Sequence, residues 1–253
     1  MKPAPNYDSH SAAFAALIDA YTSRQNGSLR DLLNAYEGKL AAWRKSEESS
    51  ASDFNVFDTL HIAHDEIRHS MMLEWLLDHR IERAGTHAQG KLGFRFFLRK
   101  AGLNMDYAKA DYFVSREVKG DSSRVDVEIA AIGQFIIHLE NKIFSEEGMN
   151  EAGKPDQTVR EWEDLQRRAR HLGVKPDCVH GFFVTPSGDT PSSKRFTAIK
   201  WDWFAEIFDE FAEHAKAGQV SLFAKHYGKA LRSMTQQITP HEQHEETNPN
   251  SQS

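Results

Sequence analysis

The chain has 253 residues, of which 40% are apolar and 27% charged, so it fits a globular protein with a buried core and excludes a wholly disordered one. The formal net charge is −6, which is unlike the basic surface usual in nucleic-acid-binding proteins. Three of the acids, Glu242, Glu245 and Glu246, lie in the last segment, and without them the net charge of −6 becomes −3.

The single cysteine, Cys178, excludes an internal disulfide framework and a zinc site built from thiolates. No segment reaches the roughly 20 apolar residues that a membrane-spanning helix needs. The first residues also lack the apolar core of a signal peptide. We therefore expect a cytoplasmic protein with no membrane partner.

The first part of the chain is helical in pattern. Apolar residues recur at helical spacing over residues 11–46, which predicts two helices interrupted near Asn26 and Gly27. Residues 46–53 are polar and predict a linker. We interpret residues 1–52 as an N-terminal helical extension, residues 53–238 as the main domain, and the polar residues 239–253 as a disordered tail.

The main domain opens with helices and then changes to strands. We expect helices from Asp53 to Asp78 and from Gly90 to Ala101. Alternating or continuous apolar residues then predict strands, with a helix from about Val159 to Leu172 before the fourth strand and closing helices at residues 201–215 and 220–234. The expected strands cover residues 112–118, 124–129, 135–143, 178–184 and 196–199. This order predicts an α/β fold, mixed α+β in type, with a central mixed sheet of four to five strands flanked by helices.

The second and third expected strands form a hairpin whose tight turn is centred on Gly133. Asp126 and Glu140 are each seven residues from Gly133, so they should stand opposite each other, roughly 5 Å apart on one face. Lys142 follows Glu140 by two residues and therefore shares that face. The hairpin brings two carboxylates and an ammonium group together.

Two adjacent carboxylates repel each other unless a cation lies between them. Magnesium prefers oxygen ligands and uses one or two carboxylates together with waters and substrate phosphate oxygens. Asp126, Glu140 and the main-chain carbonyl of Asn141 would form half of such a shell, and Lys142 would hold the attacking water. The alternative is an exposed hairpin with a Glu–Lys pair on its solvent face, since this spacing alone is a weak motif.

The segments around this hairpin resemble the PD-(D/E)XK nuclease superfamily, and within it a family with an E-N-K triplet and an upstream E-x-x-H-S helix. The resemblance covers residues 60–205 and is carried by an ordered set of short motifs. These are Arg124–Asp126, Ile137–Ile143, Glu66–Ser70, Leu73–Asp78, His87–Gly90, Phe94–Phe97, Gln157, Phe183–Gly188 and Ile199–Trp201. Two features depart from the pattern. Val125 stands where the superfamily has its proline, and the aromatic residue expected after Gln157 is Trp162, one place late.

The resemblance implies a restriction-endonuclease-like core and a nuclease that uses Mg²⁺ or Mn²⁺ to hydrolyse phosphodiester bonds. Asp126, Glu140, Asn141 and Glu66 would be metal ligands, and Lys142 would be the catalytic lysine. Gln157 would orient the lysine or the water. Nucleic acid, in the first place DNA, would be the substrate, and a homodimer is compatible with this type. The alternative function is a catalytically silent interaction module that keeps the nuclease fold.

Two further groups of residues have alternative interpretations. His61, His64, Asp65 and His69 stand at helical spacing and suggest either a separate metal site or ordinary helix-surface histidines, the second being favoured. Basic residues in and after the helix that follows the hairpin suggest either phosphate contacts or a solvated face. They are Arg160, Arg167, Arg168, Arg170, His171 and Lys175.

Overall fold

The computed structural model describes residues 7–62, 65–143 and 156–238. The chain divides into two compact units, Met1–Phe54 and Asn55–Ser253. The predicted disordered tail, residues 239–253, lies outside the described residues. Within the described part, no helix is long and apolar enough to cross a bilayer.

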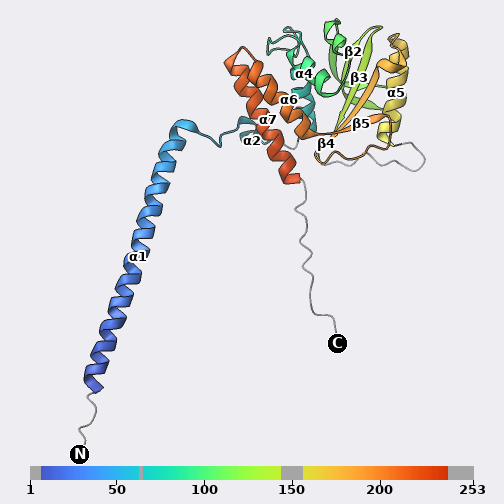
Figure 1. The fold of residues 1–253 in the computed structure, drawn as a ribbon. Helices are drawn as coiled ribbons and strands as arrows, with labels where there is room; N and C mark the ends of the chain where they lie inside the picture. Colours follow the sequence, from blue (N-terminus) through green and yellow to red (C-terminus); the bar gives the residue numbers. More distant parts are fainter. Residues whose placement is uncertain (1–6, 63–64, 144–155, 239–253) are drawn as a thin grey trace, which may run out of the picture. The chain divides into compact units, whose positions relative to one another are not determined.

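The first unit contains one helix, α1 (Tyr7–Ser50), of 44 residues (Figure 1). The prediction of two helices broken near Asn26 and Gly27 is therefore wrong. A helical glycine costs only about 1 kcal/mol relative to alanine, and the chain on both sides consists largely of good helix formers. The helix also continues to Ser50, through most of the segment expected to be a linker. Large apolar side chains along it are exposed, among them Leu32, Tyr36 and Trp43.

The second unit begins with two short helices where one was predicted. Helix α2 spans Val56–Thr59 and helix α3 spans Glu66–Leu77. His61 has a positive φ of 52°, which ends the helical path, and Asp65 caps α3 by accepting a hydrogen bond from the Arg68 N–H at 3.1 Å. The break places Glu66 in the first turn of α3 rather than in the middle of a long helix.

The sheet has five strands in the order β1-β2-β3-β4-β5. They are β1 (Phe113–Lys119), β2 (Arg124–Ala131), β3 (Phe135–Asn141), β4 (Val179–Thr185) and β5 (Phe196–Lys200). The first three strands are antiparallel, and β4 and β5 continue the sheet in parallel with β3. A mixed sheet with flanking helices confirms the predicted fold class.

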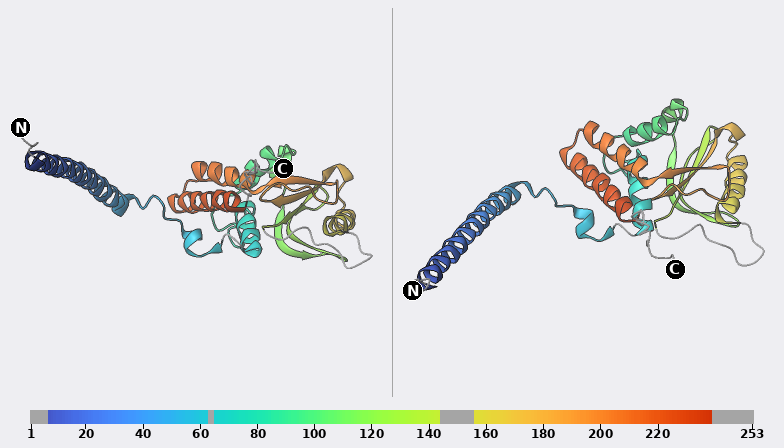
Figure 2. Two further views of the ribbon diagram at one scale, coloured as in Figure 1. Left: turned by 90° about the horizontal axis from the view of Figure 1, so that it is seen from below. Right: turned by 60° about the horizontal axis from the view of Figure 1, so that its bottom comes forward.

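Helices cover both faces of the sheet (Figures 1 and 2). The remaining helices are α4 (Leu92–Lys100), α5 (Gln157–His171), α6 (Trp201–His214) and α7 (Gly218–Ile238), with short 3-10 turns at Met105–Lys109 and Pro176–Cys178. Helices α3, α4, α6 and α7 form the large core with one face, and α5 covers the other. Side chains of β2 and β3 alternate between these faces, so Ala130 and Ile136 meet Leu165 and Ala169 of α5.

Candidate active site

The hairpin register sets the two predicted acids opposite each other. The β2–β3 pairs run from Ala131↔Phe135, around Gly133 with its φ of +72°, to Val127↔Leu139. Asp126 and Glu140 lie one step beyond the last of these pairs, and the Asn141 N–H, which follows Glu140, donates to the Asp126 carboxylate, so the two acids are neighbours. Both residues lie on the face toward α5, because they share the alternation of Ala130 and Ile136.

Asp126 lies at an interruption of the ladder. The β1–β2 pairs skip the position where Glu117 faces Asp126, and Glu117 has a positive φ of 54°. The Asp126 Oδ2 instead accepts hydrogen bonds from Asn141, at 2.8 Å from the main-chain N–H and 2.7 Å from the side-chain Nδ2. The Asn141 amide also donates to the Ser70 hydroxyl of α3 at 2.9 Å. Asn141 thus holds one oxygen of the Asp126 carboxylate; the proposed role of its main-chain carbonyl as a metal ligand stays a prediction.

Glu140 is fully buried and has two donors on one of its oxygens. Its Oε1 lies 2.9 Å from the Lys142 Nζ and also accepts a hydrogen bond from the Gln157 Nε2 of α5. Its Oε2 is buried, and no group among the residues that the structure describes is hydrogen-bonded to it. The Gln157 amide nitrogen donates to the carboxylates of Glu140 and, at 2.8 Å, Glu161, and its predicted role in orienting the lysine or a water stays a prediction.

The backbone after Glu140 is fixed from three elements. The Lys142 N–H donates to the Val184 carbonyl of β4 at 2.8 Å, and the Lys142 carbonyl accepts from the Trp201 indole of α6 at 3.1 Å. The Glu66 Oε1 of α3 accepts from the Ile143 N–H at 2.9 Å. The predicted first-helix acid therefore lies at the site and contacts the end of β3.

Burial and mutual repulsion determine the charge of these acids. Burial, followed by the neighbouring charge of Glu140, raises the pKa of Asp126 to about 8. Burial likewise raises the pKa of Glu140 above its ordinary value, although Lys142 opposes this. For Lys142, burial acts to lower the pKa, and the attraction of Glu140 outweighs it and raises the pKa. Among the described residues, the two carboxyl groups of Asp126 and Glu140 therefore share one neighbouring ammonium group, that of Lys142.

The donor set fits a hydrated divalent ion rather than a complete protein cage. Among the residues that the structure describes, no group of three or more His, Cys, Asp and Glu side chains has a metal-binding arrangement. Mg²⁺ needs fewer, because it keeps several waters and binds through one or two carboxylates. The unpartnered Glu140 Oε2 and the adjacent Asp126 carboxylate supply oxygen ligands of that kind.

Glu161 was not predicted as a site residue. It is 1% exposed, and its Oε2 is buried without a hydrogen-bond partner in the described part of the chain. Burial, and then the charge of Glu140, raises its pKa to about 10. The sequence feature that could have identified Glu161 is its spacing, because it follows Gln157 by four residues and so shares a helix face with it. The aromatic residue that the resemblance places near this position is Trp162, and its ring packs against Phe196.

The histidine group does not form a second metal site within the described residues. His69 is buried and its Nδ1 lies 2.6 Å from the Tyr227 hydroxyl, while Asp65 caps α3. His61 lies in the break before α3, and His64 lies outside the described residues. The described residues of this group do not share one helix, because His61 follows the end of α2 (Val56–Thr59) and Asp65 precedes α3 (Glu66–Leu77).

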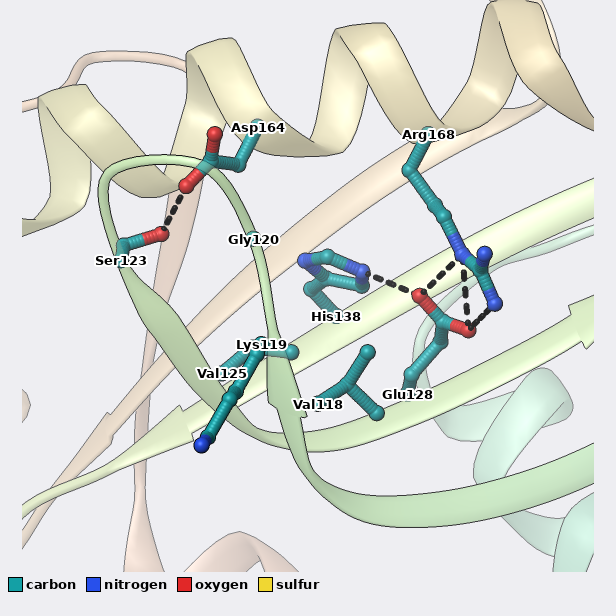
Figure 3. Close-up of a pocket in the computed structure, with 9 residues that line it drawn as sticks. All are labelled: Val118, Lys119, Gly120, Ser123, Val125, Glu128, His138, Asp164 and Arg168. Carbon is teal, nitrogen blue, oxygen red and sulfur yellow. Dashed lines mark hydrogen bonds and ion pairs between the residues drawn. The ribbon is translucent and has the colours of Figure 1, made fainter.

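A second buried polar group lies farther along the same face of β2 and β3 (Figure 3). The His138 Nε2 and the Arg168 guanidinium both pair with the Glu128 carboxylate, at 3.0 and 3.1 Å. These residues line a small pocket together with Asp164, whose carboxylate accepts hydrogen bonds from the β1–β2 turn, including the Ser123 hydroxyl at 2.6 Å. Arg167 and Arg168 thus pair with acids of the chain, whereas Arg170 and His171 are exposed.

Comparison with known proteins shows which family the chain belongs to. No curated protein and no solved structure matches the chain significantly. A family model described as "PD-(D/E)XK nuclease superfamily" matches residues 54–229, which include all five strands and every site residue described above. The match covers more than half of the chain and agrees with the mixed sheet, so this protein belongs to the PD-(D/E)XK nuclease superfamily.

Proposed function

We propose that the protein is a divalent-metal-dependent nuclease that hydrolyses phosphodiester bonds, with DNA as its substrate and Mg²⁺ or Mn²⁺ as its cofactor. The observation that carries the proposal is the convergence of Asp126, Glu140 and Lys142 on one face of the hairpin. The Glu140 Oε2, buried without a hydrogen-bond partner, supports it further. A buried carboxylate oxygen without a donor is costly unless a ligand binds it.

Asp126 and Glu140 would hold the ion, with Glu66 and the Asn141 carbonyl as additional oxygen ligands. The bound ion would polarise a phosphoryl oxygen and lower the pKa of a water. Asn141 fixes the Asp126 carboxylate through two hydrogen bonds, and Gln157 fixes the Glu140 carboxylate. These contacts leave the opposite oxygens available for the ion.

Lys142 would position the attacking water and offset the negative charge that develops on the phosphorus centre. It is well suited to this role because its pKa is raised and the ammonium form persists at neutral pH. Water would attack the phosphorus in line with the leaving oxygen, and the bond to the 3′ oxygen would break. The products would be 5′-phosphate and 3′-hydroxyl ends.

The test is a cleavage assay on plasmid and linear DNA with Mg²⁺, Mn²⁺ or EDTA. We expect metal-dependent cleavage by the wild type, and a loss of at least about 10²-fold in Asp126→Ala and Lys142→Ala. Glu163→Ala and Lys175→Ala are matched controls, since both side chains are exposed and neither contacts the site. Equal cleavage by all five proteins would refute the assignment.

The second candidate function is a catalytically silent interaction module, and α1 favours it. This helix exposes a series of large apolar side chains, including Leu29, Leu32 and Tyr36, as a protein-binding or homodimer surface would. Sedimentation equilibrium tests the homodimer: a dimeric wild type and a monomeric Leu32→Glu would support it. Cleavage by the monomeric variant would separate the dimer from the chemistry, whereas metal binding without any cleavage would favour the silent module.

A further inference from the structure

Each carboxylate of the site has one oxygen held by the chain. Asn141 holds the Asp126 Oδ2, and Lys142 and Gln157 hold the Glu140 Oε1. The same arrangement occurs a third time, on Glu161. Its Oε1 accepts a hydrogen bond from the Gln157 amide at 2.8 Å, and its Oε2 is buried with no partner among residues 7–62, 65–143 and 156–238. One amide nitrogen, that of Gln157, therefore bridges Glu140 and Glu161.

Helix α5 presents Glu161 to the site through a polar face. Gln157, Glu161, Asp164 and Arg168 follow each other at spacings of four, three and four residues, so they form one stripe along the helix. Asp164 binds the β1–β2 turn and Arg168 binds Glu128 of β2. These two contacts fix the rotation of α5 and direct Gln157 and Glu161 toward Glu140.

Within the described residues, Glu161 has no hydrogen-bonded cation of the kind that a structural buried acid needs. Glu128, equally buried on the same side of the sheet, is paired with a histidine and an arginine. Glu161 instead has the charges of Glu140 and Asp126 as its strongest unfavourable neighbours, and among the described residues its hydrogen-bond donor is the Gln157 amide. Placing a third acid beside two others destabilises the protein unless a cation joins them.

We propose that Glu161 is a further acid of the metal site, whose Oε2 accepts hydrogen bonds from water molecules that the divalent ion carries. This inference rests on the proposed nuclease function, because it assigns Glu161 to the ion held by Asp126 and Glu140. A residue that contacts an ion through its water shell typically changes metal affinity by about 10–100-fold when it is replaced.

The test is calorimetric titration of the full chain with MnCl₂ and MgCl₂, comparing wild type, Glu161→Gln and the exposed control Glu163→Gln. Glu161→Gln keeps the shape of the side chain and removes its charge. We expect a Kd for metal that is about 10–100-fold higher in Glu161→Gln and unchanged in the control. The rise in Tm produced by saturating metal should shrink in Glu161→Gln, while its Tm in EDTA stays equal to that of wild type or increases.

A Glu161→Gln protein with unchanged metal affinity and a lower Tm in EDTA would overturn the inference and make Glu161 a structural residue. If Glu161→Gln does not fold, Glu161→Asp replaces it, and an unchanged Kd there would also overturn the inference. Asp126→Asn separates this inference from the proposed function. Metal binding that is lost in Asp126→Asn but intact in Glu161→Gln refutes only the role of Glu161, whereas no binding by the wild type refutes the metal-dependent function itself.

Discussion

Two neighbouring pairs of residues on the β2–β3 hairpin differ in how their buried acids are compensated. One pair is Asp126 and Glu140, which are close enough to repel each other just beyond the last paired residues of the hairpin, and two positions along the strands Glu128 pairs with His138. Burial acts to raise the pKa of Glu128, but His138 and Arg168 outweigh it and lower that pKa. In the first pair burial and repulsion raise the pKa of Asp126 to about 8. On the same strands and under the same helix, the partners of Glu128 therefore offset the effect of its burial, whereas the neighbouring acid of Asp126 adds to it.

This difference in compensation separates acids that stabilise the fold from acids that are available to bind a ligand. Glu128 is fully buried and its carboxylate is paired with His138 and with the Arg168 guanidinium, so it joins α5 to the sheet. Glu140 keeps a buried oxygen without a partner, although α5 passes over both pairs. A fold selected only for stability would replace such an acid, since unsatisfied buried charge is costly.

The largest expected effect is on catalysis, in a direct comparison of the two pairs. Glu140→Gln should lower the rate of DNA cleavage by about 10²–10⁴-fold and leave the fold intact. Glu128→Gln should keep the rate within about tenfold of wild type but lower the free energy of unfolding by about 1–3 kcal/mol. Single-turnover cleavage and urea unfolding measure the two quantities on the same preparations.

The comparison would break if the two variants exchanged these properties. A stable but inactive Glu128→Gln would mean that the second pair takes part in the chemistry. A folded Glu140→Gln that still cleaves at the wild-type rate would remove Glu140 from the site.

The next effect concerns the ion pair between Arg168 and Glu128, which joins α5 to the sheet. Arg168→Ala leaves the buried Glu128 with His138 alone, so we expect a loss of about 1–3 kcal/mol of unfolding free energy. This range lies below that of a fully buried pair because the Arg168 side chain is 39% exposed. Arg170→Ala, on the exposed side of the same helix, is the control and should stay within about 0.5 kcal/mol of wild type.

Cleavage by Arg168→Ala tests whether the two pairs are coupled through α5. If Arg168 helps to orient this helix, the variant should also cleave more slowly at limiting Mg²⁺ and recover at high Mg²⁺. A variant that is destabilised but cleaves normally at every Mg²⁺ concentration would show that α5 keeps its position without this ion pair.

The two pairs should also give opposite dependences of stability on pH in EDTA. The folded protein holds a proton on Asp126 that the unfolded chain releases, so this acid lowers stability progressively as pH rises from 3.8 to about 8. The lowered pKa of Glu128 gives stability that is present above its ordinary value of 4.5 and is lost as pH falls through the folded pKa. Asp126→Asn should therefore gain about 1–2 kcal/mol at pH 8 and little near pH 4.

Thermal melts between pH 4 and pH 9 measure this effect for wild type, Asp126→Asn and Glu128→Gln. For a unit of about 200 residues the expected gain in Tm for Asp126→Asn at pH 8 is about 2–6 °C. A gain that is equal at both ends of the pH range would mean that Asp126 does not carry the extra proton.

The sequence predicted the pair of Asp126 and Glu140 because residues at equal distances from a hairpin turn lie opposite each other. Gly133 marks the turn, and alternation then places Asp126, Glu140 and Lys142 together. The five strands were also predictable, since each is a short run of apolar or alternating residues. Counting from Gly133 in the same way also pairs Glu128 with His138. The spacing of a glutamate and a histidine does not indicate, however, whether their contact is buried or solvated.

The parts that escaped prediction depend on contacts between distant segments or on local breaks. Glu161 reaches the site only because Asp164 and Arg168 fix the rotation of α5, and both contacts join residues about 40 positions apart. The break before α3 depends on the positive φ of His61 and on the Asp65 cap, which periodicity does not register. In α1 the opposite occurred, since a glycine that suggested a break is tolerated within a long helix.

The smallest expected effect concerns the backbone beside the pair of Asp126 and Glu140. Glu117 faces Asp126 across the β1–β2 ladder and has a φ of 54°, which side chains other than glycine adopt at a cost. Glu117→Gly should relieve this strain and raise the unfolding free energy by up to about 1 kcal/mol, since the lost ion pair with Arg124 is partly exposed and contributes little. Ser115→Gly, at a regular position of the same strand, is the control and should lower it by about 0.5–1 kcal/mol.

Opposite signs for the two glycine variants in urea unfolding would locate the strain at the position that keeps Asp126 out of the ladder. Equal losses would mean that Glu117 is not strained and that the interruption results from Asn141 alone. In the first case the cost of positioning Asp126 lies in the backbone of β1 as well as in its uncompensated charge. The pair of Asp126 and Glu140 would then be less stable than the pair of Glu128 and His138, because of backbone strain as well as uncompensated charge. Metal binding would offset both of these costs.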